Sequence, residues 1–256
     1  MPVTEDATTL DAFLGGRVTL RQPRHGYRAA TDPVFLAAAC PAKAGQTVLE
    51  LGCGAGAASL CLAARVPGLE LFGVERQPDY AALARENAAR AGAAMTVITA
   101  DLGALSHDLR QMSFDHVLAN PPFFPAGSGS QAQDPGREAA NREDTPLSIW
   151  IDTARARLKP GGWLTLIHLA ERLPDCLAAM GAGFGAVAVL PLQPRIGRAA
   201  TRVVIRARKS ARAPFALLAP FLIHEGADHA GDAPDFTDQA QAVLRAAAPL
   251  PFAGQD

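Results

Sequence analysis

Cysteines and long apolar runs are scarce in this sequence, and each absence excludes a class of protein. The four cysteines show no C-x-x-C spacing and no clustered histidine partners: Cys40, Cys53, Cys61 and Cys176. We therefore expect reduced thiols and no metal, instead of disulfides or a zinc site. No apolar run approaches the roughly 18–20 residues that a membrane span needs. Glu5 and Asp6 stand near the N-terminus without a basic segment, which predicts no signal peptide and a cytoplasmic protein.

A strong net charge is also absent. The 256 residues carry a formal net charge of −1, which argues against a general nucleic-acid coat protein, and 49% are hydrophobic, enough for a buried core. The charge is uneven, because residues 12–31 and residues 177–224 contain no Asp or Glu. These two basic windows suggest a local anionic partner, and the alternative is a solvated face paired with acids from elsewhere. The candidate contact residues are Arg21, Arg24, Arg28, Arg195, Arg198 and Arg202.

Short apolar runs closed by turn residues alternate with segments of helical periodicity. This alternation predicts an α/β fold with a doubly wound, mainly parallel sheet that binds ligands at the carboxyl ends of its strands. The expected helices span residues 57–65, 79–91 and about 145–158, and within the last of these Trp150 is expected to belong to the core. The expected strands span residues 47–51, 70–74, 95–99, 114–119, 163–167, 187–190 and 202–205.

The first 45 residues stand outside this alternation. Residues 17–22 alternate like an exposed strand, and residues 33–40 have a helical pattern. We interpret residues 1–45 as a short N-terminal cap packed on a main domain of residues 46–256. Residues 120–144 are rich in Gly, Ser, Gln and Pro, and a loop of this length is usually functional or disordered.

A glycine-rich segment follows the first main strand. It reads Glu50-Leu51-Gly52-Cys53-Gly54-Ala55-Gly56, and its glycines allow the backbone to approach a ligand closely. With Ala57 it also satisfies the dinucleotide pattern G-x-G-x-x-A. Glu75 ends the next strand, where a carboxylate can accept hydrogen bonds from ribose hydroxyls. Taken alone, these features fit a nicotinamide enzyme almost as well as a methyltransferase.

The spacing of the acidic residues separates the two classes. The string E-x-G-x-G-x-G resembles motif I of class I methyltransferases, where the residue matching Glu50 helps to hold the methionine end of S-adenosylmethionine. Asp101 directly follows the third strand, where this class places a polar residue on the adenine of the cofactor. The alternative for Asp101 is an N-cap of the next helix.

Asn120-Pro121-Pro122-Phe123 closes the fourth strand and is the most specific pattern in the chain. It resembles the (D/N/S)-P-P-(Y/F/W) motif of amino methyltransferases that act on adenine N6, guanine N2 or glutamine amides. A conjugated NH2 group is a poor nucleophile, and two acceptors aimed at its N–H bonds favour the charge that grows during attack. The Asn120 side-chain oxygen and the Pro121 carbonyl can be these acceptors, and Phe123 can stack on a base. This chemistry requires no metal.

With these residues in hand, the chain resembles the bacterial tRNA (adenine-N6)-methyltransferase family that modifies a valine tRNA next to its anticodon. Residues 26–38, 137–143, 200–209 and 236–238 resemble further segments of that family. The resemblance implies a single class I, Rossmann-like domain with strand order 3-2-1-4-5-7-6 and an antiparallel final hairpin. It also implies a tRNA partner and an S-adenosylmethionine site that includes Asp32, Glu50, Gly52, Gly54, Gly56, Glu75, Asp101 and Asn120.

Other substrates and classes stay open at this point. Protein-glutamine methyltransferases share N-P-P-(Y/F) but usually carry a longer helical N-terminal domain, for which 45 residues leave little room. Ribosomal RNA guanine-N2 enzymes share the motif as well, often within a duplicated fold that 256 residues cannot hold. A non-catalytic nucleotide-binding protein is the alternative from another class. The sequence predicts nothing about oligomeric state.

Overall fold

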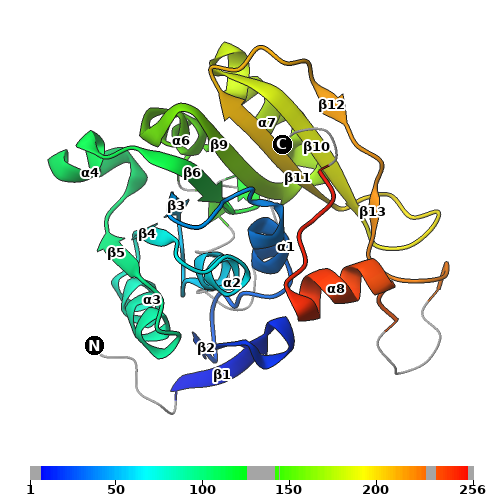
Figure 1. Ribbon diagram of the computed structural model, residues 1–256, viewed down its shortest axis with the longest axis horizontal. Helices are drawn as coiled ribbons and strands as arrows, with labels where there is room; N and C mark the ends of the chain where they lie inside the picture. The colour runs from blue at the N-terminus through cyan, green and yellow to red at the C-terminus, as the bar shows by residue number, and fades with distance from the viewer. Residues whose placement is uncertain (1–6, 126–141, 144, 229–234, 253–256) are drawn as a thin grey trace.

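A mainly parallel sheet forms the centre of the computed structural model, which describes residues 7–125, 142–143, 145–228 and 235–252 (Figure 1). Its strand order is β12-β10-β11-β9-β6-β3-β4-β5, and β13 also pairs with β10. The seven main strands are β3 (Thr47–Leu51), β4 (Glu70–Glu75), β5 (Met95–Thr99), β6 (Phe114–Ala119), β9 (Leu158–Leu169), β10 (Phe184–Gln193) and β11 (Arg202–Lys209). In chain order these strands lie 3-2-1-4-5-7-6, which confirms the expected topology.

The direction of the strands follows the expectation too. The first five main strands run parallel to one another, whereas β11 is antiparallel to both β9 and β10. The carboxyl ends of β3, β4, β6 and β9 therefore meet at one edge of the sheet, and the connection from β10 to β11 lies at this same edge. We call it the carboxyl edge.

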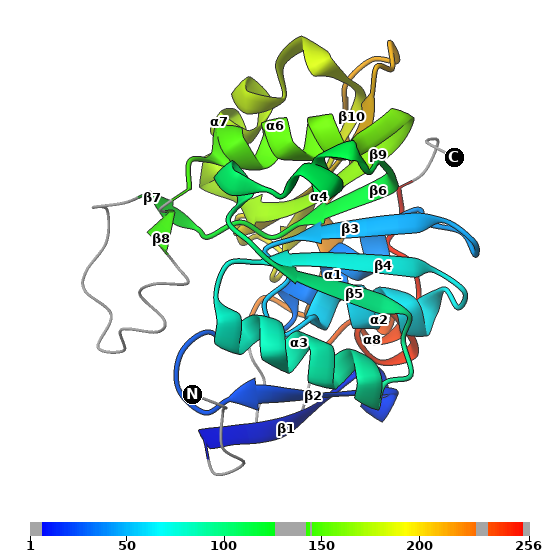
Figure 2. The same cartoon turned by 90° about the vertical axis from the view of Figure 1, so that its left-hand side faces the viewer.

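Helices cover both faces of the sheet (Figure 2). Successive side chains of a strand point to opposite faces, so Val48 packs with the helices of one face and Leu49 with those of the other. One layer holds α1 (Asp32–Ala39), α2 (Ala57–Arg65), α3 (Pro78–Arg90) and α8 (Asp238–Ala246), and the other holds α4 (His107–Gln111), α6 (Leu147–Arg157) and α7 (Leu173–Met180). Trp150 lies in the second core cluster and is 7% exposed, as expected of a core residue.

The ends of the helices agree with the local sequence. Pro78 occupies the first turn of α3, where its missing N–H costs nothing. Gly92, just beyond the helix, has a φ of 61°, the left-handed conformation that commonly ends helices. The Thr237 hydroxyl accepts a hydrogen bond from the Ala240 N–H at 3.1 Å and begins α8.

The N-terminal residues form a hairpin of β1 (Thr8–Phe13) and β2 (Val18–Pro23). The Asn87 side chain of α3 fixes the hairpin, because it accepts from the Arg21 N–H at 2.7 Å and donates to the Arg21 carbonyl at 3.0 Å. The strand expected over residues 17–22 is β2, whereas its partner β1 was not foreseen. The helix expected over residues 33–40 is α1, which packs against α2 and the sheet.

Some elements differ from the expectation. Lys159–Gly162 was expected to separate α6 from the next strand, but β9 already begins at Leu158 and its pairing with β6 shifts register before His116. The remaining short elements were not foreseen: β7 (Phe124–Pro125), β8 (Arg142–Glu143), β12 (Ala216–Leu217), β13 (Phe221–Leu222) and the 3-10 turns at Leu14–Gly16, Leu102–Ala104, Ala170–Arg172 and Gly181–Gly183. Most of the loop expected over residues 120–144 lies outside the described residues. Within the described chain, no helix combines the length and apolar character that a membrane crossing requires.

Candidate active site

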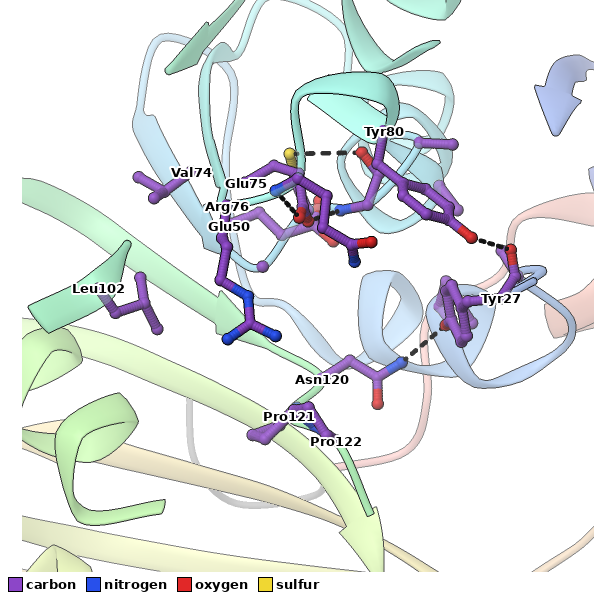
Figure 3. A pocket seen from close by; sticks show the side chains of 18 of the residues that line it. Tyr27, Glu50, Val74, Glu75, Arg76, Tyr80, Leu102, Asn120, Pro121 and Pro122 are labelled. Carbon is purple, nitrogen blue, oxygen red and sulfur yellow. Dashed lines mark hydrogen bonds between the residues drawn. The ribbon is translucent and has the colours of Figure 1, made fainter. Parts of the chain in front are cut away.

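A cavity opens at the carboxyl edge, between the ends of β3, β4 and β6 (Figure 3). Eight of the residues expected in the site line it: Glu50, Gly52, Gly54, Glu75, Asp101, Asn120, Pro121 and Phe123. Gly56 and Asp32 do not line it. Gly56 precedes α2 with a φ of 88°, and Asp32 begins α1.

Glu50 lies on β3 and is buried, with only 4% of the residue exposed. Its Oε2 accepts from the Ser59 N–H at 2.9 Å and from the Ser59 hydroxyl at 2.5 Å. Burial raises the pKa of Glu50 to about 7, and the nearby charge of Glu75 adds to the shift, whereas the bonds from Ser59 oppose it. A cationic group bound beside Glu50 would favour its charged form.

The glycine loop brings backbone close to the cavity. A Cβ at Gly52 would lie 2.5 Å from Cη2 of Trp150, and its φ of 63° also disfavours other residues. Trp150 therefore closes the cavity from the α6 side while it packs in the core. Gly54, by contrast, is open towards the cavity, because a Cβ there would meet only Cε1 of Tyr27, at 3.9 Å.

Glu75 ties the glycine loop to the end of β4. Its Oε2 accepts from the Gly54 N–H at 2.9 Å, and its Oε1 accepts from the Gln77 N–H at 2.8 Å. These two bonds fix the carboxylate in the cavity wall, 7% exposed. A carboxylate has about four acceptor positions, so both oxygens keep capacity for the hydroxyls of a ribose.

Asp101 caps the next turn, as one interpretation of the sequence expected, and the contact with the cofactor's adenine stays a prediction. Asp101 lines the cavity directly after β5, and its Oδ1 accepts from the Gly103 N–H at 2.8 Å, which caps the 3-10 turn Leu102–Ala104. The cap leaves the other carboxylate oxygen to contact a ligand.

Asn120 lines the cavity directly after β6. Its Nδ2 donates to the Tyr27 hydroxyl at 3.4 Å (Figure 3). Its Oδ1 is buried and has no hydrogen-bond partner among the described residues. Because a buried polar atom is normally paired, this oxygen is an acceptor prepared for a group that the protein itself does not provide.

Phe123 already has neighbours on several sides. The Arg202 guanidinium lies over its ring at 4.5 Å, and the His168 ring meets it at 5.8 Å in a T-shaped arrangement. Arg172 donates to the Phe123 carbonyl at 3.2 Å. Burial lowers the pKa of His168 to about 4, so this imidazole is neutral near pH 7. Arg202 covers one face of Phe123, and a stacked ligand would need the other face.

Several of the expected RNA-contact arginines have acidic partners within the protein. Arg21 binds Glu86 at 2.7 Å, Arg28 binds Asp11 at 2.7 Å, Arg198 binds Asp228 at 3.1 Å and Arg202 binds Asp32 at 3.0 Å. Arg195 pairs with Asp235, and Arg24 is exposed. The side chain of Arg198 is 64% exposed, which makes it the most accessible of the paired arginines.

Sequence reasoning missed six polar residues of the cavity: Gln22, Tyr27, Arg76, Gln77, Tyr80 and Thr145. Tyr27 belongs to the segment after β2 that carried the family resemblance, but its own role was not foreseen. Nothing in the local pattern marks it, because its partner Asn120 lies 93 residues away in the sequence.

The fold and the site together define the class. A Rossmann-like sheet places a glycine loop, two buried carboxylates and an N-P-P-F turn around one cavity. The open backbone at Gly54, the ribose-type acceptor at Glu75 and the unpartnered Oδ1 of Asn120 fit S-adenosylmethionine beside an amino substrate. The protein is an S-adenosylmethionine-dependent methyltransferase.

Comparison with known proteins names the family. The methyltransferase small domain family matches residues 31–195, and the chain belongs to it. The tRNA1(Val) (adenine(37)-N6)-methyltransferase of Porphyromonas gingivalis is 36% identical over 174 residues, which cover 64% of this chain and 68% of that protein. The release factor glutamine methyltransferase of Geobacter sulfurreducens is 32% identical over 150 residues, 56% of this chain and 50% of that protein.

A solved structure extends the likeness over most of the chain. The structure of a predicted O-methyltransferase from Agrobacterium tumefaciens superposes with a TM-score of 0.69 at 28% identity. The match covers 86% of this chain and 98% of that chain. This coverage agrees with the class I fold.

We expect the affinity for S-adenosylhomocysteine to fall below pH 7. The pKa of Glu50 in the free protein is about 7, so at lower pH its carboxyl group is protonated and cannot pair with the ammonium group of the ligand. Coupling to one proton gives about a tenfold loss of affinity per pH unit below this pKa. Calorimetric titration between about pH 5.5 and 7.5 measures it. Glu50→Gln should bind weakly and without this slope, and a flat wild-type profile would remove Glu50 from the ammonium site.

Proposed function

We propose that this methyltransferase transfers the methyl group to the exocyclic N6 amine of an adenine in tRNA, beside the anticodon. The observation that carries the proposal is the buried Oδ1 of Asn120, an acceptor without a partner among the described residues, in an N-P-P-F turn next to the cofactor cavity. Such an acceptor suits a substrate that presents an N–H, as an amine does. A carbon atom that is methylated has no such donor to offer.

The residues of the turn provide the chemistry. Asn120 Oδ1 accepts one N–H of the amine, and the Pro121 carbonyl is the second acceptor. Together they draw the nitrogen towards a tetrahedral shape and stabilise the positive charge that develops on it. The prolines fix φ, so both acceptors are in place before the substrate arrives. When bound, S-adenosylmethionine would supply the methyl group from its sulfonium and leave as S-adenosylhomocysteine, and the extra proton of the methylated nitrogen would pass to water.

Phe123 holds the base. A base that has left its stack can lie on the face of Phe123 opposite Arg202, an interaction worth roughly 1–3 kcal/mol. The guanidinium of Arg202 is fixed by Asp32, so it supports the ring from behind. This arrangement gives Asp32 a role in the substrate half of the site through Arg202.

The two named relatives suggest different substrates, because they act on a tRNA adenine and on a release factor glutamine. Two observations favour tRNA. The alignment covers more of the tRNA enzyme than of the release factor enzyme, 68% against 50%. Both basic windows also contribute residues to the carboxyl edge, since the loop before Arg202 and the segment around Tyr27 both adjoin the site.

Transfer of a labelled methyl group distinguishes the substrates. Purified protein should label an unmodified tRNA transcript containing the valine anticodon arm, and nucleoside mass spectrometry should find the label in N6-methyladenosine. A release factor carrying its glutamine should remain unlabelled under the same conditions. Label in the release factor and none in tRNA would replace the proposal with the glutamine activity.

We expect tRNA binding to weaken with salt, and Arg198 to contribute to that dependence. Arg198 lies in the exposed loop between β10 and β11, at the carboxyl edge. Each phosphate contact contributes about 0.7 log units of affinity per decade of salt on single-stranded RNA. Arg198→Ala should therefore reduce the slope by about this amount without changing cofactor affinity. Arg202→Ala is a less direct test, because Arg202 also binds Asp32 and supports Phe123.

Arg110 provides the matched control for this measurement. It is exposed on α4, just before β6 begins, and so lies at the edge of the sheet opposite the site. Arg110→Ala removes the same charge and should leave the salt slope unchanged. Equal slopes in wild type and Arg198→Ala would exclude Arg198 from the RNA surface.

We further propose that residues 1–45 act as a cap on a catalytic domain of residues 46–256. The hairpin of β1 and β2 is held by Asn87, and Tyr27 beyond it reaches the cavity. A tRNA substrate would place the enzyme in the cytoplasm. The expectation that the loop 120–144 orders on RNA concerns residues that lie mostly outside the described structure.

A further inference from the structure

Tyr27 lies between β2 and α1, before the strands of the main sheet, and lines the cavity. Two hydrogen bonds hold it, one at its backbone and one at its hydroxyl. The Tyr80 hydroxyl of α3 donates to the Tyr27 backbone carbonyl at 3.0 Å. At the other end, the Tyr27 hydroxyl accepts from Asn120 Nδ2 at 3.4 Å, and Figure 3 shows the two side chains directed towards each other. The segment between β2 and α1 is thereby connected to the catalytic turn.

The contact engages the NH2 side of the Asn120 amide. An amide has an acceptor on one side and two donors on the other, and exchanging them reverses its polarity towards a ligand. In the observed arrangement the NH2 group is engaged by Tyr27, and Oδ1 remains buried without a partner among the described residues. The opposite arrangement would present N–H groups to the N–H groups of the target amine, and the two would repel.

The Tyr27 hydroxyl can donate as well as accept, and in the observed arrangement it accepts from the amide. Burial raises the pKa of Tyr27 well above its ordinary value, and the charge of Asp32 adds to this shift. The phenol therefore stays protonated and neutral across the physiological range. A neutral hydroxyl oxygen keeps a lone pair with which it can accept from Nδ2.

We propose that Tyr27 is a positioning residue, whose hydroxyl fixes the amide of Asn120 with its oxygen free to accept from the amine that is methylated. The proposal rests on the proposed function insofar as it assigns Asn120 to an amino substrate. The competing role for Tyr27 is that of a wall of the cofactor cavity, which its ring near Gly54 would serve without the hydroxyl.

Tyr27→Phe separates the two roles, because it removes the hydroxyl and keeps the ring. The variant should lose about tenfold in kcat, as expected for one hydrogen bond, while KM for the substrate and the dissociation constant of S-adenosylhomocysteine stay within about twofold. In an Asn120→Ala background the same substitution should cause no further loss of kcat.

Wild-type kcat in Tyr27→Phe, a loss of cofactor affinity that accounts for the loss of rate, or multiplicative effects with Asn120→Ala would each overturn the proposal. A second readout needs no substrate. The side-chain amide protons of Asn120, assigned by NMR in the S-adenosylhomocysteine complex through their absence in Asn120→Ala, should shift and exchange faster in Tyr27→Phe. Unchanged chemical shifts of these amide protons would contradict the positioning role. This measurement does not depend on which substrate is methylated, so its failure is distinct from failure of the proposed function.

Discussion

Asn120→Ala should lower kcat by about two orders of magnitude and leave the affinity for S-adenosylhomocysteine nearly intact. The substitution removes the acceptor that faces the target amine, whereas the acidic groups expected to hold the cofactor, Glu50 and Glu75, lie on other strands. Single-turnover kinetics with labelled cofactor, together with calorimetric titration of S-adenosylhomocysteine, measures both quantities.

Asn120→Asp supplies the conservative comparison. Aspartate keeps an acceptor at the same place but loses the Nδ2 that donates to Tyr27. Its kcat should therefore lie between those of wild type and Asn120→Ala. A fully active Asn120→Ala variant, or one that simply fails to bind the cofactor, would remove Asn120 from its role towards the amine.

Glu75→Ala should weaken S-adenosylhomocysteine binding by about a hundredfold. The side chain is the acceptor expected for two ribose hydroxyls, and hydrogen bonds to a charged group contribute about 1.5–3 kcal/mol each. The substitution also frees the Gly54 N–H, which the carboxylate now holds at 2.9 Å, so the glycine loop loses part of its support. Calorimetry gives the affinity, and thermal unfolding shows whether the loop alone has loosened.

Glu70→Ala is the matched control, because Glu70 is an exposed glutamate at the opposite end of the same strand, β4. It should bind S-adenosylhomocysteine like wild type. Glu75→Gln, which keeps one acceptor oxygen, should be intermediate. If Glu75→Ala binds as tightly as Glu70→Ala, the ribose is not held by Glu75.

The central strands could be predicted closely from the sequence. Thr47–Leu51 and Phe114–Ala119 match the expected ranges residue for residue, because buried parallel strands are short apolar runs that end at turn residues. The edge strand Met95–Thr99 matches its expected range as well. The two-residue strands β12 and β13 could not be predicted, since two residues have no periodicity. Their position beside β10 depends on pairing with a strand distant in the sequence.

The site was predictable where its residues follow strands. Glu75, Asp101 and Asn120 end or follow neighbouring strands, and parallel topology brings such positions to one edge. Contacts between distant segments were not predictable. Windows free of acidic residues revealed the arginines but not their partners, because Arg202 and Asp32 are separated by 170 positions.

Nucleoside mass spectrometry of bulk tRNA, from cells with and without the gene, tests the central claim most directly. The account predicts N6-methyladenosine in the valine tRNA of the parent strain, its loss on deletion, its return with the wild-type gene and its continued absence with Asn120→Ala. Unchanged N6-methyladenosine after deletion, with loss of methylated glutamine from a release factor, would contradict it.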